Sequence, residues 1–324
     1  MSIEVLAPGL LTTVQAHGRE GFRHLGVGFG GALDPETHAI ANLLVGNAAS
    51  AATLEIALAG PTLRFEHASR IALCGAAFDA DIDGEPLFGW RSATLPAGSV
   101  LRIGGCRTGA RAWLAVSGGI RVPAVLGSAS TDLRGGFGGV EGRALRAGDR
   151  LHAEPFTETV ERTRIAPWWI DPHALDAQPS SPIRVLPGSD ATDPGGGLFE
   201  HAWTIAPASD RQGLRLAGTA LAVRDAREYM SEPIIPGTVQ LPSGGEPIVL
   251  LADAQTHGGY PRIGHVIRAD RGRLAQSRAG DKVRFAPCTP AEALAAVRER
   301  AHTLARIALA IAGRTGVAPL RPSA

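Results

Sequence analysis

Residues 70–87 read RIALCGAAFDADIDGEPL, an apolar run that leads into the turn dipeptide Asp83-Gly84. Asp-Gly between two extended runs is typical of a tight β-hairpin, whose central residues adopt positive φ. Outward from this hairpin, short apolar runs broken by turns continue from residue 53 to residue 153, as in TLRF (62–65) and RAWLAVSGGI (111–120). We therefore expect residues 1–155 to form a β-rich domain.

The second half of the chain repeats this pattern, for example in IRVLPG (183–188) and KVRF (282–285). It predicts another β-rich domain over residues 183–288. Residues 156–182 are rich in Pro, Ser and Thr and have weak periodicity, which indicates a linker region.

Two helices have clear start signals. Asp34 can cap a helix with Pro35 in its first turn, and Gly46 ends it. The sequence Thr289-Pro290-Ala291-Glu292 has the form of a capping box, so we expect a C-terminal helix over residues 289–314.

The composition excludes several classes of protein. The 324 residues include 41 Gly and 23 Pro, are 44% hydrophobic and carry a net charge of +1. This is typical of a globular chain with many turns, and it does not favour nucleic-acid binding. The sequence contains no apolar run of 18 residues and no secretory leader, so we expect no membrane segment and a cytoplasmic location.

Three distant cysteines without a CxxC motif indicate reduced thiols, and the sequence shows no metal signature. Lysine occurs once, at Lys282, so a P-loop is absent.

Polar residues are densest in the second half. Ser209-Asp210-Arg211 is followed by Thr238-Val239-Gln240 and by Asp253-Ala254-Gln255-Thr256-His257-Gly258-Gly259-Tyr260-Pro261. Short neutral donors beside glycines suit an amide or ureide ligand, and Asp210 and Asp253 are candidates for acid–base work. The alternative is structural, because Asp253 can cap a turn and Tyr260-Pro261 can form a corner.

A glycine cluster in the first half could bind an anion. Arg134 precedes Gly135, Gly136, Gly138 and Gly139. A glycine-rich loop lets backbone amides approach a phosphate, and an arginine adds a charged clamp. A pair of tight turns explains the same glycines without a ligand.

Several motifs together resemble one family. They are PGLLTTVQ (8–15), GALDP (31–35), GSASTDLR (127–134), GFGG (136–139), GTVQ (237–240) and DAQTHGGYPRI (253–263). In these the chain resembles the biotin-dependent carboxyltransferase subdomain A/B family, which includes the 5-oxoprolinase C subunits, allophanate hydrolase subunit 2 and urea amidolyase-like proteins. The resemblance implies a mainly β fold with a few helices, built of tandem β-barrel, cyclophilin-like domains.

The resemblance also implies an activity. It is that of one component of an ATP-dependent 5-oxoprolinase, a hydrolase that uses ATP with Mg²⁺ to activate 5-oxoproline for ring opening to glutamate. Its partners would be a protein like the 5-oxoprolinase B subunit and a ring-opening subunit, and the isolated chain would be inactive. Two alternatives stay open: the carboxyltransferase component of a urea or amide carboxylase, supplied with carboxybiotin by a separate carrier, and a non-catalytic regulatory subunit.

For such an activity, the density of polar motifs suggests the residues that carry it. Asp210, Asp253 and Tyr260 are expected to be catalytic, the glycine cluster with Arg134 is expected to bind the phosphates of ATP, and the residues expected to bind substrate are Arg211, Gln240, Gln255, Thr256 and His257. The chain departs from the family pattern at His257, where Thr is usual, and at Gly30, where Ser is usual. Either departure could alter the substrate.

Overall fold

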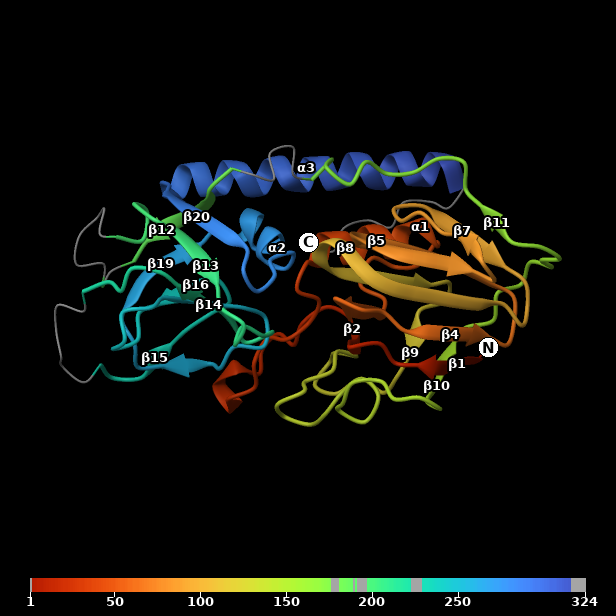
Figure 1. Ribbon diagram of the computed structural model, residues 1–324, viewed down its shortest axis with the longest axis horizontal. Helices are drawn as coiled ribbons and strands as arrows, with labels where there is room; N and C mark the ends of the chain where they lie inside the picture. Colours follow the sequence, from red (N-terminus) through yellow and green to blue (C-terminus); the bar gives the residue numbers. More distant parts are fainter. Residues whose placement is uncertain (1, 176–180, 189, 191–196, 223–228, 316–324) are drawn as a thin grey trace. The chain divides into compact units, whose positions relative to one another are not determined.

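The computed structural model describes residues 2–175, 181–188, 190, 197–222 and 229–315 (Figure 1). The chain forms two compact units. Unit 1 consists of Met1–Gly18, Asp34–Ala177 and His302–Ala324, and unit 2 consists of Arg19–Leu33 and Gln178–Ala301. Residues 19–33, which the predicted boundaries place in the first domain, thus belong to the second unit.

Unit 1 is built on a single antiparallel sheet. Within the described residues the sheet has 11 strands, eight of them in the order β11-β7-β5-β8-β4-β1-β10-β9. Its elements are β1 (Ser2–Ala7), β2 (Leu11–Gln15), α1 (Pro35–Leu44), β3 (Thr53–Ala57), β4 (Thr62–Phe65), β5 (Ser69–Ile82), β6 (Glu85–Pro86), β7 (Ser92–Leu95), β8 (Val100–Val116), β9 (Ile120–Arg121), β10 (Arg150–Ala153) and β11 (Arg164–Ile165).

The predicted hairpin at Asp83-Gly84 is confirmed. It joins β5 to β6, with Ile82 opposite Glu85, and its two central residues have φ of 53° and 89°. Strand β5 pairs along much of its length with β8, and their apolar side chains contribute to the unit 1 core. This core includes Val14, Leu54, Ile56, Leu63, Phe65, Ile71 and Leu114.

Helix α1 begins where the sequence predicts. The Asp34 carboxylate accepts hydrogen bonds from the backbone amides of Glu36 and Thr37, both at 3.2 Å. These bonds satisfy amide groups that have no partner inside the first turn of the helix. The helix buries His38 and Asn42 among its side chains.

Unit 2 contains a closed β-barrel, with strand order β12-β19-β16-β17-β14-β13-β20. The mainly β, barrel-containing fold is therefore confirmed. The elements of the unit are η1 (Arg23–Leu25), β12 (Ile183–Pro187), β13 (Ala202–Ile205), β14 (Gly213–Ala217), β15 (Glu232–Pro233), β16 (Thr238–Gln240), β17 (Ile248–Leu250), β18 (His257–Gly258), β19 (Arg262–Val266), η2 (Arg268–Asp270), α2 (Arg271–Leu274) and β20 (Lys282–Pro287).

The last helix is α3 (Pro290–Thr315), the long blue helix in Figure 1. Its predicted capping box is present: the Glu292 carboxylate accepts from the Thr289 amide at 2.7 Å, and the Thr289 hydroxyl accepts from the Glu292 amide at 3.3 Å. Its first turns pack on unit 2, where Ala296 is buried with Ile267 and Cys288.

The burial of His38 predicts a pH dependence of stability. Burial lowers the pKa of His38 from 6.5 to about 4, because an apolar surrounding disfavours the charged ring. His38 becomes protonated near pH 6.5 in the unfolded chain but stays neutral in the folded chain down to about pH 4. The free energy of unfolding is therefore unaffected by this group above pH 6.5. It falls by about 1.4 kcal/mol per pH unit as the pH decreases from 6.5 toward 4.

Urea unfolding of wild type and His38→Asn between pH 7.5 and pH 5 tests this prediction. We expect the variant to show a weaker loss of unfolding free energy below pH 6.5, and the exposed-site control His67→Asn to follow the wild type. Equal pH profiles for wild type and His38→Asn would contradict it.

Candidate functional site

The alternation of side chains along three barrel strands of unit 2 creates a concave surface. Strand β17 pairs with β14 on one side and with β16 on the other. Leu214, Val249 and Val239 stand opposite one another in these pairings and are fully or almost fully buried. Since neighbouring residues of a strand face opposite sides, the residues beside them point away from the barrel interior.

These outward residues line a pocket of about 220 Å³ in unit 2. The strands supply Gly213, Arg215, Gln240, Ile248 and Leu250. The flanking loops supply Asp210, Gln212, Pro242, Gln255 and Tyr260. The structure thus brings together four of the residues predicted from the sequence, Asp210, Gln240, Gln255 and Tyr260.

Gln240 is the most distinctive residue of the pocket. The side chain is 1% exposed, and within the described part of the chain its Nε2 has no hydrogen-bond partner. A Cβ atom at Gly258 would lie 2.5 Å from this nitrogen, so the glycine leaves room for the amide. A buried donor without a partner is costly, and a ligand with an acceptor oxygen would satisfy it.

Asp210 is held at the rim of the pocket by its own loop. Its Oδ1 accepts from the backbone amides of Gln212, at 2.7 Å, and Gly213, at 3.3 Å. This turn fixes an exposed carboxylate next to the first residue of β14. Gln255 and Tyr260, which is 48% exposed, are also accessible from solvent.

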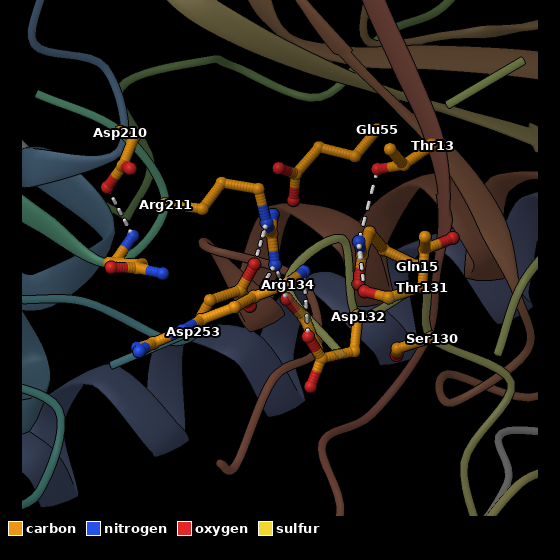
Figure 2. A network of polar contacts seen from close by, with 12 residues as sticks. Thr13, Gln15, Glu55, Ser130, Thr131, Asp132, Arg134, Asp210, Arg211 and Asp253 are labelled. Atoms are coloured by element: carbon orange, nitrogen blue, oxygen red, sulfur yellow. Dashed lines mark hydrogen bonds and ion pairs between the residues drawn. The ribbon is translucent and has the colours of Figure 1, made fainter. Parts of the chain in front are cut away.

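Arg211 and Asp253 form a buried ion pair. Arg211 Nε donates to Asp253 Oδ2 at 2.8 Å, and Arg211 Nη2 donates to Oδ1 at 3.0 Å (Figure 2). The two side chains are only 5% and 8% exposed. Neither residue lines the pocket, but each is adjacent in sequence to a loop that does.

The pair also holds the N-terminal part of unit 2. Arg211 Nη2 donates to the Gly31 carbonyl at 2.6 Å, and the Gly30 amide donates to the Ala252 carbonyl at 2.9 Å. Gly30 has φ of +63°, a conformation that a serine would adopt only with strain. The backbone therefore explains glycine at this departure from the family pattern.

Thr256 and His257 lie beside the pocket residue Gln255. The Thr256 hydroxyl and His257 Nδ1 are 2.9 Å apart, with the threonine buried and the histidine exposed. His257 lies in β18, which pairs with β15. Neither residue lines the pocket, and their predicted contact with substrate stays a prediction.

Several backbone amides of the glycine cluster in unit 1 form hydrogen bonds within unit 1. Asp132 Oδ1 accepts from the amides of Arg134 and Gly135, and the Asp132 carbonyl accepts from the Gly136 amide (Figure 2). The Gly139 amide donates to the Ala129 carbonyl. Because these amides already have partners, a phosphate at this loop would chiefly contact the exposed Arg134 side chain.

A second polar cluster in unit 1 was not predicted. Thr13 lies opposite Glu55 in the pairing of β2 with β3, and Trp113 of β8 donates to Glu55 at 3.1 Å. The Gln15 amide donates to Thr13 Oγ1 and to the Thr131 carbonyl (Figure 2). The sequence signal was the polar alternation in TTVQ (12–15), where Thr13 and Gln15 share one face of the strand.

The described residues hold no group of three or more His, Cys, Asp or Glu side chains that could bind a metal ion. The same part of the chain contains no helix with the length and apolarity to cross a membrane.

Comparison with known proteins places these features in a family. Residues 25–287 match the family described as carboxyltransferase domain, subdomain A and B. The chain belongs to this family. The resemblance predicted from the motifs is therefore confirmed.

Individual relatives of the chain have two kinds of name. The chain is 40% identical over 313 residues to the 5-oxoprolinase C subunit of Escherichia coli, covering 94% of this chain and 97% of that protein. It is 36% identical to the 5-oxoprolinase C subunit of Haemophilus influenzae, covering 87% and 90%. The crystal structure of K. lactis urea amidolyase matches with a TM-score of 0.85 at 27% identity, over 94% of this chain and 20% of that one.

The Arg211–Asp253 pair yields a prediction about stability. Asp253→Leu leaves a buried guanidinium without its carboxylate, so we expect the unfolding free energy to fall by about 3–5 kcal/mol. The double variant Arg211→Met/Asp253→Leu removes both charges and should recover a large part of this loss. Urea unfolding measures the free energy of unfolding of the double variant and of the single variants Asp253→Leu and Arg211→Met. A loss in the double variant equal to the sum of the two single losses would contradict the coupling.

Proposed function

We propose that this chain is the C subunit of an ATP-dependent 5-oxoprolinase and that the unit 2 pocket binds 5-oxoproline. The family and the 40% identity to the Escherichia coli C subunit support the first part. The observation that carries the second part is the buried Gln240 amide, whose Nε2 faces no acceptor among the described residues.

The size and chemistry of the pocket fit a small lactam. Its volume of about 220 Å³ lies below that of pockets that enclose drug-sized molecules. Gln240, Gln255 and Tyr260 provide neutral donors and acceptors, and Ile248 and Leu250 provide an apolar floor. A single ring with one amide group matches both parts of this surface.

In the proposed mechanism Gln240 binds the lactam oxygen. A hydrogen bond from its Nε2 orients the lactam oxygen and draws electron density from the carbonyl carbon. Asp210 lies at the rim, where it can accept a proton from water that approaches the carbonyl. Asp253 acts through Arg211, because the pair positions the loops that carry Asp210 and Gln255.

In this proposal ATP transfers its γ-phosphoryl group to the lactam oxygen, and ADP and the lactam N–H proton leave. Water then adds to the activated carbon, the ring C–N bond breaks with protons going to the nitrogen, and inorganic phosphate leaves to give glutamate. Contact between ATP and this chain at the glycine cluster stays a prediction, and it rests on the Arg134 side chain, since the amides of Gly135, Gly136 and Gly139 have internal partners. We expect a protein like the 5-oxoprolinase B subunit and a ring-opening subunit to complete the reaction.

Reconstitution tests this function. The chain, the protein like the B subunit and the ring-opening subunit are mixed with 5-oxoproline, ATP and Mg²⁺, and released glutamate is measured. We expect glutamate only when every component is present. Absence of glutamate with partner proteins that are active beside another 5-oxoprolinase C subunit would refute the proposal.

Substitution of Gln240 tests the pocket within that assay. Gln240→Leu removes the donor and should lower kcat/KM for 5-oxoproline by about tenfold to a hundredfold. Gln276→Leu, outside the pocket, is the matched control and should keep the wild-type value. An unchanged kcat/KM in a correctly folded Gln240→Leu variant would remove the pocket from the mechanism.

The similarity to K. lactis urea amidolyase supports a second candidate, the carboxyltransferase component of a urea carboxylase. We rank it lower because the identity is 27%, against 40% for the 5-oxoprolinase relative from Escherichia coli. Carboxybiotin consumption that depends on urea and on this chain would favour it, whereas ATP-dependent glutamate release would not.

A further inference from the structure

Arg215 is a charged residue of the unit 2 pocket to which neither the motifs nor the mechanism above gives a role. It lies on β14 at an outward position, between the barrel-facing Leu214 and Leu216. Both of its backbone polar groups are hydrogen-bonded: its amide donates to Ser209 Oγ at 3.0 Å, and its carbonyl accepts from the Ala206 amide at 2.9 Å.

The guanidinium of Arg215 has no carboxylate partner among the described residues. The other arginine of this region, Arg211, is paired with Asp253. The acidic pocket residue, Asp210, directs one carboxylate oxygen to the amides of Gln212 and Gly213. Among the described residues, Arg215 is therefore an accessible cation without an ionic partner, and it lines a small pocket.

The strand register places Arg215 at a fixed distance from Gln240. Arg215 lies opposite Ile248 on β17, and Ile248 lies opposite Gln240 on β16. The three residues form one row across adjacent strands, so the backbones of Arg215 and Gln240 are about 10 Å apart. Two long side chains that point to the same face can reach opposite ends of one small ring.

The pocket lining between these two side chains is apolar. Gly213 has no side chain, and a Cβ there would lie 3.0 Å from the Ile248 side chain. Ile248 and Leu250 form the floor. A ligand that fills the pocket meets the Arg215 guanidinium at one end and the Gln240 side chain, whose Nε2 is covered in this structure, at the other.

We propose that Arg215 binds a carboxylate of the ligand and makes the pocket selective for cyclic amides that carry one. This inference rests on the proposed function and adds a reason for substrate choice. In 5-oxoproline the carboxylate and the lactam oxygen are carried by the two ring carbons that flank the nitrogen, so they point to different sides of it and Arg215 and Gln240 can hold both groups. Urea and simple lactams lack the carboxylate and gain nothing from Arg215.

The experiment compares two ligands in the reconstituted complex. One is 5-oxoproline, and the other is 2-pyrrolidinone, the same ring without the carboxylate. KM and kcat are measured for 5-oxoproline, the inhibition constant is measured for 2-pyrrolidinone, and calorimetry gives the affinity of both. The variants are Arg215→Gln, the charge-preserving Arg215→Lys and the control Arg284→Gln, an exposed strand position outside the pocket.

We expect Arg215→Gln to raise KM for 5-oxoproline by about tenfold to a hundredfold with a smaller change in kcat, since it removes binding common to ground state and transition state. The inhibition constant of 2-pyrrolidinone should not change. Arg215→Lys should recover part of the loss, and Arg284→Gln should behave as the wild type.

Two outcomes would overturn the inference and leave the proposed function intact. In both, the wild-type complex releases glutamate, and Arg215→Gln either keeps the wild-type KM or weakens both ligands equally. A wild-type complex that releases no glutamate contradicts the proposed function instead. In that case calorimetry still tests the role of Arg215. A wild type that prefers 5-oxoproline over 2-pyrrolidinone, with the preference lost in Arg215→Gln, supports the inference. Equal affinity of the wild type for both ligands refutes it.

Discussion

The closed barrel of unit 2 imposes the constraint on which the site depends. A closed sheet needs its inward positions for side chains that fill the interior, here Leu214, Val239 and Val249. The remaining positions of the same strands must then face outward, and a shift of one residue in the pairing would exchange the two sets. The row of Arg215, Ile248 and Gln240 is thus a direct consequence of how the barrel is packed.

The loops that complete the pocket are fixed by electrostatics. The buried pair of Arg211 and Asp253 joins the loop before β14 to the loop after β17, and Arg211 also binds the Gly31 carbonyl. These contacts bring residues far apart in sequence together within one unit. They also give two charged residues of the motif region a positioning role, since neither lines the pocket.

Much of the fold follows from local sequence signals. The Asp83-Gly84 hairpin, the Asp34 cap and the Thr289–Glu292 capping box each depend on a few adjacent residues, and each has the predicted geometry. Motif density also identified Asp210, Gln240, Gln255 and Tyr260, which line one pocket. Barrel closure depends on distant contacts, and it was expected only through the family resemblance of the motifs. The membership of residues 19–33 in unit 2 also depends on distant contacts, and the sequence patterns did not predict it.

Arg215 shows the same limit at the level of a single residue. In GLRLA (213–217) the alternation of Leu214 and Leu216 indicates that Arg215 faces away from them, but only the pairing with Ile248 places it near Gln240. The glycine cluster is the converse case. Its composition suggested a phosphate site, whereas the partners of its amides show that turn geometry already uses several of these glycines.

A crystal structure of the chain with its partner proteins, grown with 5-oxoproline, would test the proposed pocket by direct observation. We expect electron density for the lactam in the unit 2 pocket, with its carbonyl oxygen within hydrogen-bond distance of Gln240 Nε2. Density for 5-oxoproline at another place in the complex, with Gln240 Nε2 bonded to a protein group or to water, would contradict the assignment.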